Sequence, residues 1–299
     1  MTAGKHFLLN GTLQPEDGRL FGLDNRALSQ GDCIKEIIHS CGDRLCFFQE
    51  HMEHLRQGME KAQMQIPEKF KNANDVFYNE VSKLLSKNRT FRSSNVTIMA
   101  YRSAVTNTPA PDPSEYLVTA DPVNYLGYEI NKDGLRIDIY EDSPWPTGPM
   151  GAYITQGNGP MKAALRKLCL HKRLHDMILL SADGNIIESS MGGNIFIIKD
   201  GTIMTPPESD GCSTDVFRTK VLEAARACGL STGQSMHLTP ADMENCSEVF
   251  LGSTVYGIRW IGAYRNRRFI KSKSQAIHTK INEMYQAERT GNPDEPAAI

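Results

Sequence analysis

The sequence predicts a mixed α/β protein built from two domains, and three observations support this fold class. The chain has 299 residues, which is enough for two ordinary domains. Apolar runs typical of strands are interspersed with segments of helical periodicity. The turn-rich segment DPVNYLGYEINKDG at 121–134 is the natural place to divide the chain. We therefore expect a smaller domain over 1–120, a larger domain over 121–288 and a polar, disordered tail over 289–299.

In the first half, hydrophobic spacing distinguishes two helices from the strands around them. The second of these helices has Val76 and Phe77 on its apolar face. The segments 24–32 and Thr106–Ser114 are rich in turn residues and are expected to lack regular structure. In order, the expected elements are a hairpin over Phe7–Leu13, a strand at Ile34–Ile38 turning at Gly42-Asp43 into Leu45–Phe48, helices Glu50–Gln63 and Asn74–Leu85, and strands Asn95–Tyr101 and Val118–Ala120.

The second half predicts further strands with helices between them. Pro160 precedes one helix, Thr239 is the expected N-cap of another, and Gly229 ends a third. Ser143–Met150 is expected to be a loop. In order, the expected elements are strand Leu135–Ile139, helix Met161–His175, strands from Met177 through Thr205, helices Thr214–Cys228 and Pro240–Asn245, strand Val249–Leu251, a hairpin of Arg259–Tyr264 with Arg268–Ile270, and helix Ser274–Glu288.

Composition excludes several classes of function. The formal net charge is −2, which gives no reason to expect nucleic acid or an anionic membrane as a partner. No apolar run approaches the roughly 18–20 residues needed to span a bilayer, and the N-terminus has no apolar region of signal-peptide length. We therefore expect a cytoplasmic protein.

The cysteines and histidines predict neither disulfides nor a metal site. Seven cysteines are scattered without a C-x-x-C pair, which favours reduced thiols. His51, His54, His171 and His175 have no thiol partners at the spacing of metal ligands. His171 and His175 are four residues apart on a predicted helix and are interpreted as solvated polar side chains.

The most informative segment is ESSMGGNIFIIKDGTIMTP, at Glu188–Pro206. Its small residues leave the backbone bare beside the carboxylate of Glu188, so a flat ligand could approach closely. Ile195–Ile198 is an apolar, β-branched run, and Asp200-Gly201 is a strong hairpin signal. The alternative interpretation of Glu188 is an exposed glutamate in a turn.

This segment, with its glutamate, asparagine, Asp-Gly and Thr-Pro, resembles the corresponding block of class IV aminotransferases, the pyridoxal-phosphate enzymes of fold type IV. The resemblance extends from about Phe7 to Ile270. Three further pieces are similar to family motifs, namely GDCIKE at 31–36, GCST at 211–214 and CSEVFLGST at 246–254. The resemblance implies two α/β domains with the pocket between them, a homodimer, and an amino acid or keto acid as the ligand. The related activities are transamination of branched-chain or D-amino acids and lyase chemistry on aminodeoxychorismate.

The resemblance also assigns cofactor contacts. Glu188 matches the carboxylate that keeps the pyridine nitrogen protonated. Phosphate contacts are implied at a helix N-terminus and at the end of a strand, although ordinary capping and turn chemistry would explain the same residues. The implied cofactor-binding residues are Glu188, Asn194, Cys212, Ser213, Ser253, Thr254 and His54.

Four positions depart from the family pattern. Thr155 stands where the family has its Schiff-base lysine, and a hydroxyl cannot replace that amine. His54 stands in place of an arginine that binds phosphate, and a histidine near neutrality is at best a partial cation. Thr214 also replaces an arginine, and Lys35 replaces an aromatic residue of the pocket.

Three hypotheses accommodate these departures. Another lysine could substitute, either Lys35 or Lys162, although Lys162 lies about 10 Å further along a helix axis and is expected to be a surface residue. Alternatively, the protein binds pyridoxal phosphate or a related phosphate without transamination, or the pocket serves a different small molecule or has been lost. Because the lysine and the phosphate arginine are both replaced, the sequence favours altered or lost catalysis.

Overall fold

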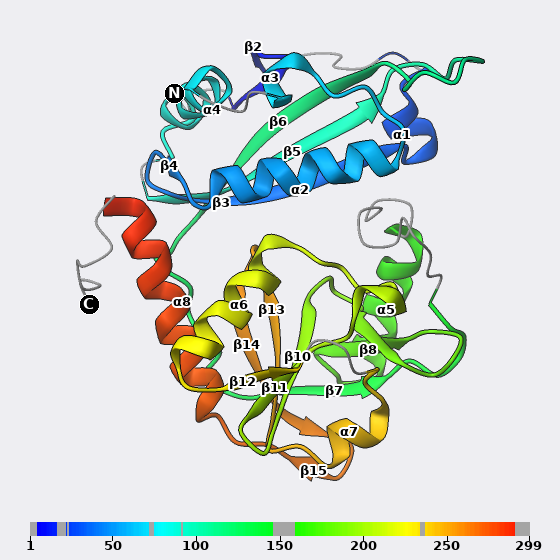
Figure 1. The fold of residues 1–299 in the computed structure, drawn as a ribbon, viewed down its shortest axis with the longest axis vertical. Coiled ribbons are helices and arrows are strands. Elements are labelled where there is room, and N and C mark those ends of the chain that lie inside the picture. The colour runs from blue at the N-terminus through cyan, green and yellow to red at the C-terminus, as the bar shows by residue number, and fades with distance from the viewer. Residues whose placement is uncertain are drawn as a thin grey trace. The chain divides into compact units, whose positions relative to one another are not determined.

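The computed structural model describes residues 5–16, 22, 24–71, 75–90, 92–145, 159–233 and 237–290 (Figure 1). These residues form two compact units. The first contains the described residues up to Gly127 together with 285–290, and the second contains those from Tyr128 to Met284. Thr155 and most of the expected loop Ser143–Met150 lie outside the described residues.

The first unit is built on an antiparallel sheet with helices beside it. The central strands β5 and β3 pair over their whole overlap, from Cys33 opposite Tyr101 to Cys41 opposite Ser93. In sheet order the strands are β2 (Thr12–Pro15), β1 (His6–Leu9), β6 (Ser114–Val123), β5 (Ser93–Arg102), β3 (Cys33–Cys41) and β4 (Arg44–Leu45). The helices are α1 (Arg26–Gln30), α2 (Phe48–Lys61), α3 (Glu68–Lys71) and α4 (Asp75–Lys87).

The predicted helix at Glu50–Gln63 is confirmed as α2, which runs along β3 (Figure 1). Met52, Leu55 and Met59 are fully buried because their helical spacing places them on one apolar face. The helix begins at Phe48, so the expected second hairpin strand is shorter and ends at Leu45.

Several predictions for the first unit are wrong in detail. Arg26–Gln30 is helical, with the Asn25 side chain accepting from the Leu28 amide at 3.0 Å and Gly31 closing the helix at a φ of 67°. Val76 is 64% exposed, because α4 buries the face containing Phe77 instead. Strand β6 runs from Ser114 to Val123, since it pairs along the full length of β5.

The second unit contains a mixed sheet surrounded by helices. Strand β7 lies between β14 and β8 and is parallel to both. In sheet order the strands are β12 (Ser231–Gly233), β11 (Thr202–Met204), β10 (Asn194–Lys199), β13 (Glu248–Ser253), β14 (Gly257–Tyr264), β7 (Leu135–Ile139), β8 (Asp176–Leu180) and β9 (Ile186–Ser189), with β15 (Arg267–Arg268) beside β14. The helices are α5 (Gly159–Lys172), the 3-10 helix η1 (Glu208–Asp210), α6 (Val216–Ala227), α7 (Pro240–Glu244) and α8 (Lys273–Thr290).

The central hairpin of this sheet forms where the sequence predicts it. Asp200 and Gly201 both have positive φ, at 49° and 75°, as the tight turn between β10 and β11 requires. Strand β10 is buried on both faces, and Phe196 stacks on Phe250 of β13 at 5.0 Å between ring centroids. Helix α8 continues to Thr290, beyond the expected end at Glu288.

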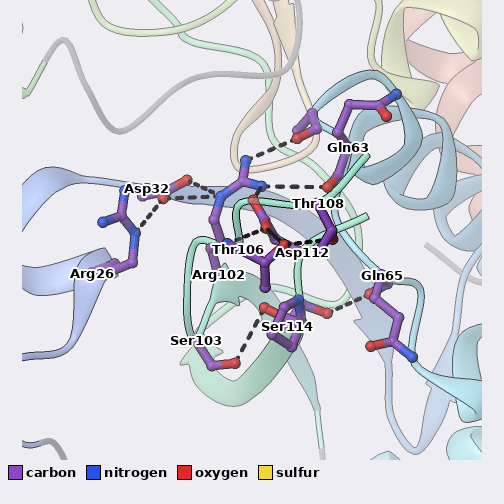
Figure 2. A network of polar contacts seen from close by, with 12 residues as sticks. Arg26, Asp32, Gln63, Gln65, Arg102, Ser103, Thr106, Thr108, Asp112 and Ser114 are labelled. Atoms are coloured by element: carbon purple, nitrogen blue, oxygen red, sulfur yellow. Dashed lines mark hydrogen bonds and ion pairs between the residues drawn. The ribbon is translucent and has the colours of Figure 1, made fainter. Parts of the chain in front are cut away.

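A polar network fixes the loop between β5 and β6 in the first unit (Figure 2). The guanidinium of Arg102 donates to Asp32 Oδ2 at 3.1 Å and to Asp112 Oδ2 at 2.7 Å. Asp112 Oδ1 accepts from the Thr106 amide at 2.7 Å, and Asp32 also accepts from Arg26 at 2.8 Å. The loop 103–113 is therefore irregular, as expected, but Asp112 ties it to Arg102 of β5, and Arg102 is joined through Asp32 to Arg26 of α1.

No helix within the described ranges combines the length and apolar character needed to cross a bilayer. In the same ranges, the histidine, cysteine and acidic side chains form no group of three suited to hold a metal ion.

Candidate active site

The carboxylate of Glu188 and the ammonium of Lys162 form an ion pair in the second unit. Glu188 is near the end of β9 and its side chain is 13% exposed, while Lys162 is in the first turn of α5 and is 24% exposed. Their Oε1 and Nζ atoms are 3.6 Å apart. Nζ also lies 5.9 Å from the ring centroid of Trp145, which is buried. Lys162 is thus part of the site, which corrects the expectation of a surface lysine.

The electrostatics of Glu188 are unfavourable to its ionised form. Burial raises the pKa of this carboxyl above its ordinary value of 4.5, and the charge of Lys162 and its hydrogen bond only partly offset that rise. Asp215 and Asp176 raise the pKa further by repulsion. The negative charges of Asp215 and Asp176 therefore both oppose ionisation of Glu188.

Asp176 is a buried member of this site that the sequence analysis did not identify. It begins β8 and is 3% exposed. Its Oδ1 accepts from the Ser190 hydroxyl at 2.7 Å and from the amides of Met177 and Met191 at 2.8 and 3.2 Å. Burial raises its pKa. In the sequence, Asp176 is simply an acidic residue before the apolar run 177–180, and nothing in that pattern indicates that its side chain is buried.

The N-terminus of α6 is capped by an acid. The helix begins at Val216, two residues later than expected, and Asp215 Oδ1 accepts from the Arg218 amide at 2.8 Å. The same oxygen accepts from Asn194 Nδ2 at 2.9 Å. Asn194 is therefore held at the start of β10 by the helix cap.

The segment before α6 brings Cys212 and Ser213 to this helix end. The thiol of Cys212 is buried and donates to the carbonyls of Pro206 and Pro207 at 3.2 and 3.3 Å. Burial raises its pKa to about 11, so the thiol is neutral. Ser213 and Thr214 are half-buried. Ser213 thus lies two residues before Asp215, the N-cap of α6.

Ser253 and Thr254 lie where β13 ends. Gly252 pairs with Asn194 of β10, so these hydroxyl residues follow directly beside the start of β10. Both are 5% exposed. Ser253 Oγ accepts from the Val255 amide at 3.2 Å, and the Thr254 carbonyl accepts from Tyr128 Oη at 2.8 Å. The second unit therefore brings Glu188, Asn194, Ser213, Ser253 and Thr254 to neighbouring strand and helix ends.

Tyr256 approaches the backbone of the ESSMGG segment at Gly193, which has no side chain. A Cβ atom built on Gly193 would lie 1.9 Å from Tyr256 Oη, so only glycine fits there. The half-buried Tyr256 ring packs against Arg259, whose guanidinium carbon is 4.3 Å from the ring centroid. Burial raises the pKa of this phenol. A protein side chain thus occupies part of the space that the sequence predicts for a ligand.

His54 and Lys35 belong to the first unit. Glu36, buried on β3, accepts from His51 Nδ1 at 2.6 Å and from His54 Nδ1 at 2.7 Å. Burial opposes ionisation of Glu36, but the bonds and charges of the two histidines hold its pKa below 4.5. Lys35 is half-buried on β3 opposite Met99. His54 is therefore oriented by a carboxylate.

Comparison with known proteins identifies related sequences. The family model described as "Amino-transferase class IV" matches residues 36–264. Branched-chain amino acid aminotransferase 1, mitochondrial, of Humulus lupulus is 27% identical over 188 residues, which cover 61% of this chain and only 47% of that protein. The chain thus spans about half the length of this relative. D-alanine aminotransferase of Listeria monocytogenes is 22% identical over 291 residues, covering 95% of this chain and 96% of that protein.

Solved structures share the architecture. The branched-chain aminotransferase of Thermoproteus uzoniensis, solved with norvaline, has a TM-score of 0.82, 19% identity, and coverage of 96% of this chain and 97% of that chain. A second branched-chain amino acid aminotransferase, solved with N-(5'-phosphopyridoxyl)-L-glutamate, has a TM-score of 0.79, 19% identity, and coverage of 96% of both chains. These matches confirm the predicted α/β architecture of fold type IV. With the family match over 36–264, they show that the chain belongs to the class IV aminotransferases and is related to the branched-chain and D-amino acid transaminases.

Proposed function

We propose that this protein binds an amine-bearing small molecule, such as an amino acid, and does not transaminate it through a covalently held pyridoxal phosphate. Class IV aminotransferases depend on that cofactor, and one structurally similar aminotransferase was solved with a phosphopyridoxyl compound. The observation that carries the proposal is the ion pair between Lys162 and Glu188, in a chain with threonine at position 155.

The position of Lys162 argues against its use as a substitute for the family lysine. Its ammonium contacts Glu188, the residue that matches the partner of the pyridine nitrogen. That nitrogen lies across the ring from the carbon that a lysine must attack. Lys162 is therefore at the wrong end of the ring to take the place of the family lysine.

The donor set does not fit a phosphate-bearing cofactor. A phosphate is bound best by guanidinium or ammonium groups together with backbone amides. The matching positions provide the hydroxyls of Ser213, Ser253 and Thr254, with Asp215 at the helix end and His54 bonded to Glu36. Asp176 and Asp215 already accept hydrogen bonds from protein groups, so Glu188 is the carboxylate that we propose to pair with the ammonium group of a ligand in place of Lys162.

Reduction with borohydride tests the absence of a covalent cofactor. The full-length protein is incubated with pyridoxal phosphate, reduced, digested and mapped by mass spectrometry. We expect no modified lysine in the wild type. The Thr155→Lys variant is the matched control, because it returns an amine to the family position. Since the phosphate contacts remain replaced in this variant, we expect an adduct at position 155 only at a large excess of pyridoxal phosphate. An adduct at Lys35 or Lys162 together with transamination would overturn the proposal.

Calorimetric titration tests the ligand class. Branched-chain and D-amino acids are compared with their keto acids on the wild type, Glu188→Ala and Lys162→Met. We expect only the amino acids to bind, with affinity reduced at least about tenfold by Glu188→Ala, since a desolvated ion pair is lost. Lys162→Met frees the carboxylate and is expected to strengthen binding. Tighter binding of the keto acids would contradict this assignment.

The assembly state follows from the family resemblance, and we propose a homodimer. Light scattering on the eluate of a size-exclusion column tests it, with 33.3 kDa as the mass of one chain. A monomer across the micromolar range would contradict it.

A further inference from the structure

Two thiols of the first unit are in contact at the β3–β4 hairpin. Cys41 ends β3 and Cys46 follows β4, and their Sγ atoms are 3.3 Å apart, with Cys46 donating. Cys41 pairs with Arg44, and the Cys46 amide donates to the His39 carbonyl at 3.0 Å. Because Cys46 lies two residues beyond Arg44, its side chain is on the same face as Cys41. The register of the hairpin therefore brings the thiols together.

The surroundings of this pair are largely aromatic and closed to large molecules. Cys41 is 3% exposed and Cys46 is 0% exposed. Phe47 and His39 both pack edge-on against Tyr285, with ring centroids 4.9 and 5.7 Å away. Only a small, uncharged reagent can reach the sulfur atoms without opening the unit.

Cys41 differs from the other buried cysteines in its ionisation. The hydrogen bond from Cys46 lowers the pKa of Cys41, with a smaller contribution from His39, and burial does not cancel these effects. The pKa of Cys46 is raised by the same bond and by burial. Cys33 and Cys246 have their pKa raised to about 11 by burial. Cys41 is thus the sulfur with thiolate character, and Cys46 is its protonated neighbour.

We propose that Cys41 and Cys46 form a site of reversible oxidation, at which hydrogen peroxide converts the adjacent thiols into an intramolecular disulfide. The sulfur atoms must approach by only about 1 Å to reach bonding distance. The bridge would join the end of β3 to the residue before Phe47, the N-cap of α2.

The chemistry balances with peroxide as the two-electron oxidant. The Cys41 thiolate attacks one peroxide oxygen, so that an S–O bond forms, the O–O bond breaks and the departing hydroxide takes a proton to become water. Cys46 then gives up its proton and attacks Cys41 Sγ. The S–S bond forms, the S–O bond breaks, and the second oxygen leaves as water. Two thiols and one peroxide thus yield one disulfide and two waters, and a dithiol reductant reverses the change by exchange.

Peptide mapping of the folded, full-length protein tests the site. The protein is treated with hydrogen peroxide, alkylated under denaturing conditions and digested, with a sample re-reduced by dithiothreitol. We expect a peptide cross-link between Cys41 and Cys46 that re-reduction removes. In Cys46→Ser the cross-link is impossible, and Cys41 is expected to be oxidised to sulfenic acid, which dimedone added with the denaturant then traps. Cys33→Ser, on the same strand, is the matched control and should cross-link as the wild type does.

Two outcomes would overturn the proposal. In the first, Cys41 and Cys46 are fully alkylated after peroxide treatment that oxidises methionine in the same sample. In the second, the cross-links join other cysteines. Because the wild-type map alone decides between these results, the test does not depend on the variants folding.

Discussion

The ammonium of Lys162 lies 3.6 Å from Glu188 Oε1, so the carboxylate that the sequence marks as a cofactor contact already has a cation of the same chain beside it. The pKa of Glu188 is nevertheless raised by burial. A carboxyl whose pKa is higher in the folded state stabilises the fold at low pH, and this stabilisation is lost as pH rises from 4.5 through the folded pKa.

Substitution of Glu188 by glutamine is therefore expected to weaken the decline in stability as pH rises. Thermal unfolding of wild type and Glu188→Gln, followed from about pH 4 to 8, measures the difference. Lys162→Met should have the opposite effect and cost about 1 kcal/mol at neutral pH, because the carboxylate loses its partner. Parallel pH profiles for the wild type and both variants would show that the pair does not control this titration.

Asp176 is expected to be the more important acid for stability. Asp176→Ala leaves the Ser190 hydroxyl and two amides without their acceptor, so we expect a loss of about 2–4 kcal/mol in the free energy of unfolding. Asp176→Asn keeps one acceptor oxygen and is the matched control, with a smaller loss. Urea denaturation measures both, and equal losses would assign the effect to packing instead.

Gly193→Ala is expected to destabilise the second unit by about 1–3 kcal/mol, because the new methyl group would overlap with Tyr256 Oη. Tyr256→Phe removes that oxygen and should rescue part of the loss, which a double-mutant cycle of unfolding free energies measures. Gly159→Ala, where nothing lies within 4 Å of the added Cβ, is the control and should be nearly neutral. Strict additivity of the two substitutions would refute the predicted overlap.

Glu36→Gln is expected to cost about 3 kcal/mol at neutral pH, since both histidines lose a buried ionised partner. The pKa of Glu36 is lowered in the folded state, so its contribution is present above 4.5 and is lost as pH falls through the folded pKa. The variant should therefore lose less stability on acidification than the wild type. Chemical denaturation at about pH 7 and 4 tests this, and an unchanged acid sensitivity would count against it.

Arg102→Met is expected to loosen the loop 103–113, because the guanidinium joins Asp32 to Asp112 (Figure 2). Limited proteolysis should then cut this loop several times faster, while cleavage elsewhere is unchanged. Arg102→Lys can reach only one carboxylate well and should be intermediate. Cleavage at the wild-type rate in Arg102→Met would show that other contacts hold the loop.

The sequence by itself determined the family, the α/β class and most strands and helices, because these depend on local periodicity and turn chemistry. The hairpin at Asp200-Gly201 and the helix α2 are examples. Threonine at position 155 is likewise a fact of the sequence alone.

Only the tertiary structure decided which side chains meet. The pairing of Lys162 with Glu188 joins α5 to β9, and the burial of Asp176 depends on Ser190 from another segment. Cys41 and Cys46 appear scattered in the sequence, but the β3–β4 register places their sulfur atoms in contact. These contacts depend on the packing of separate elements, and no local pattern of residues encodes that packing.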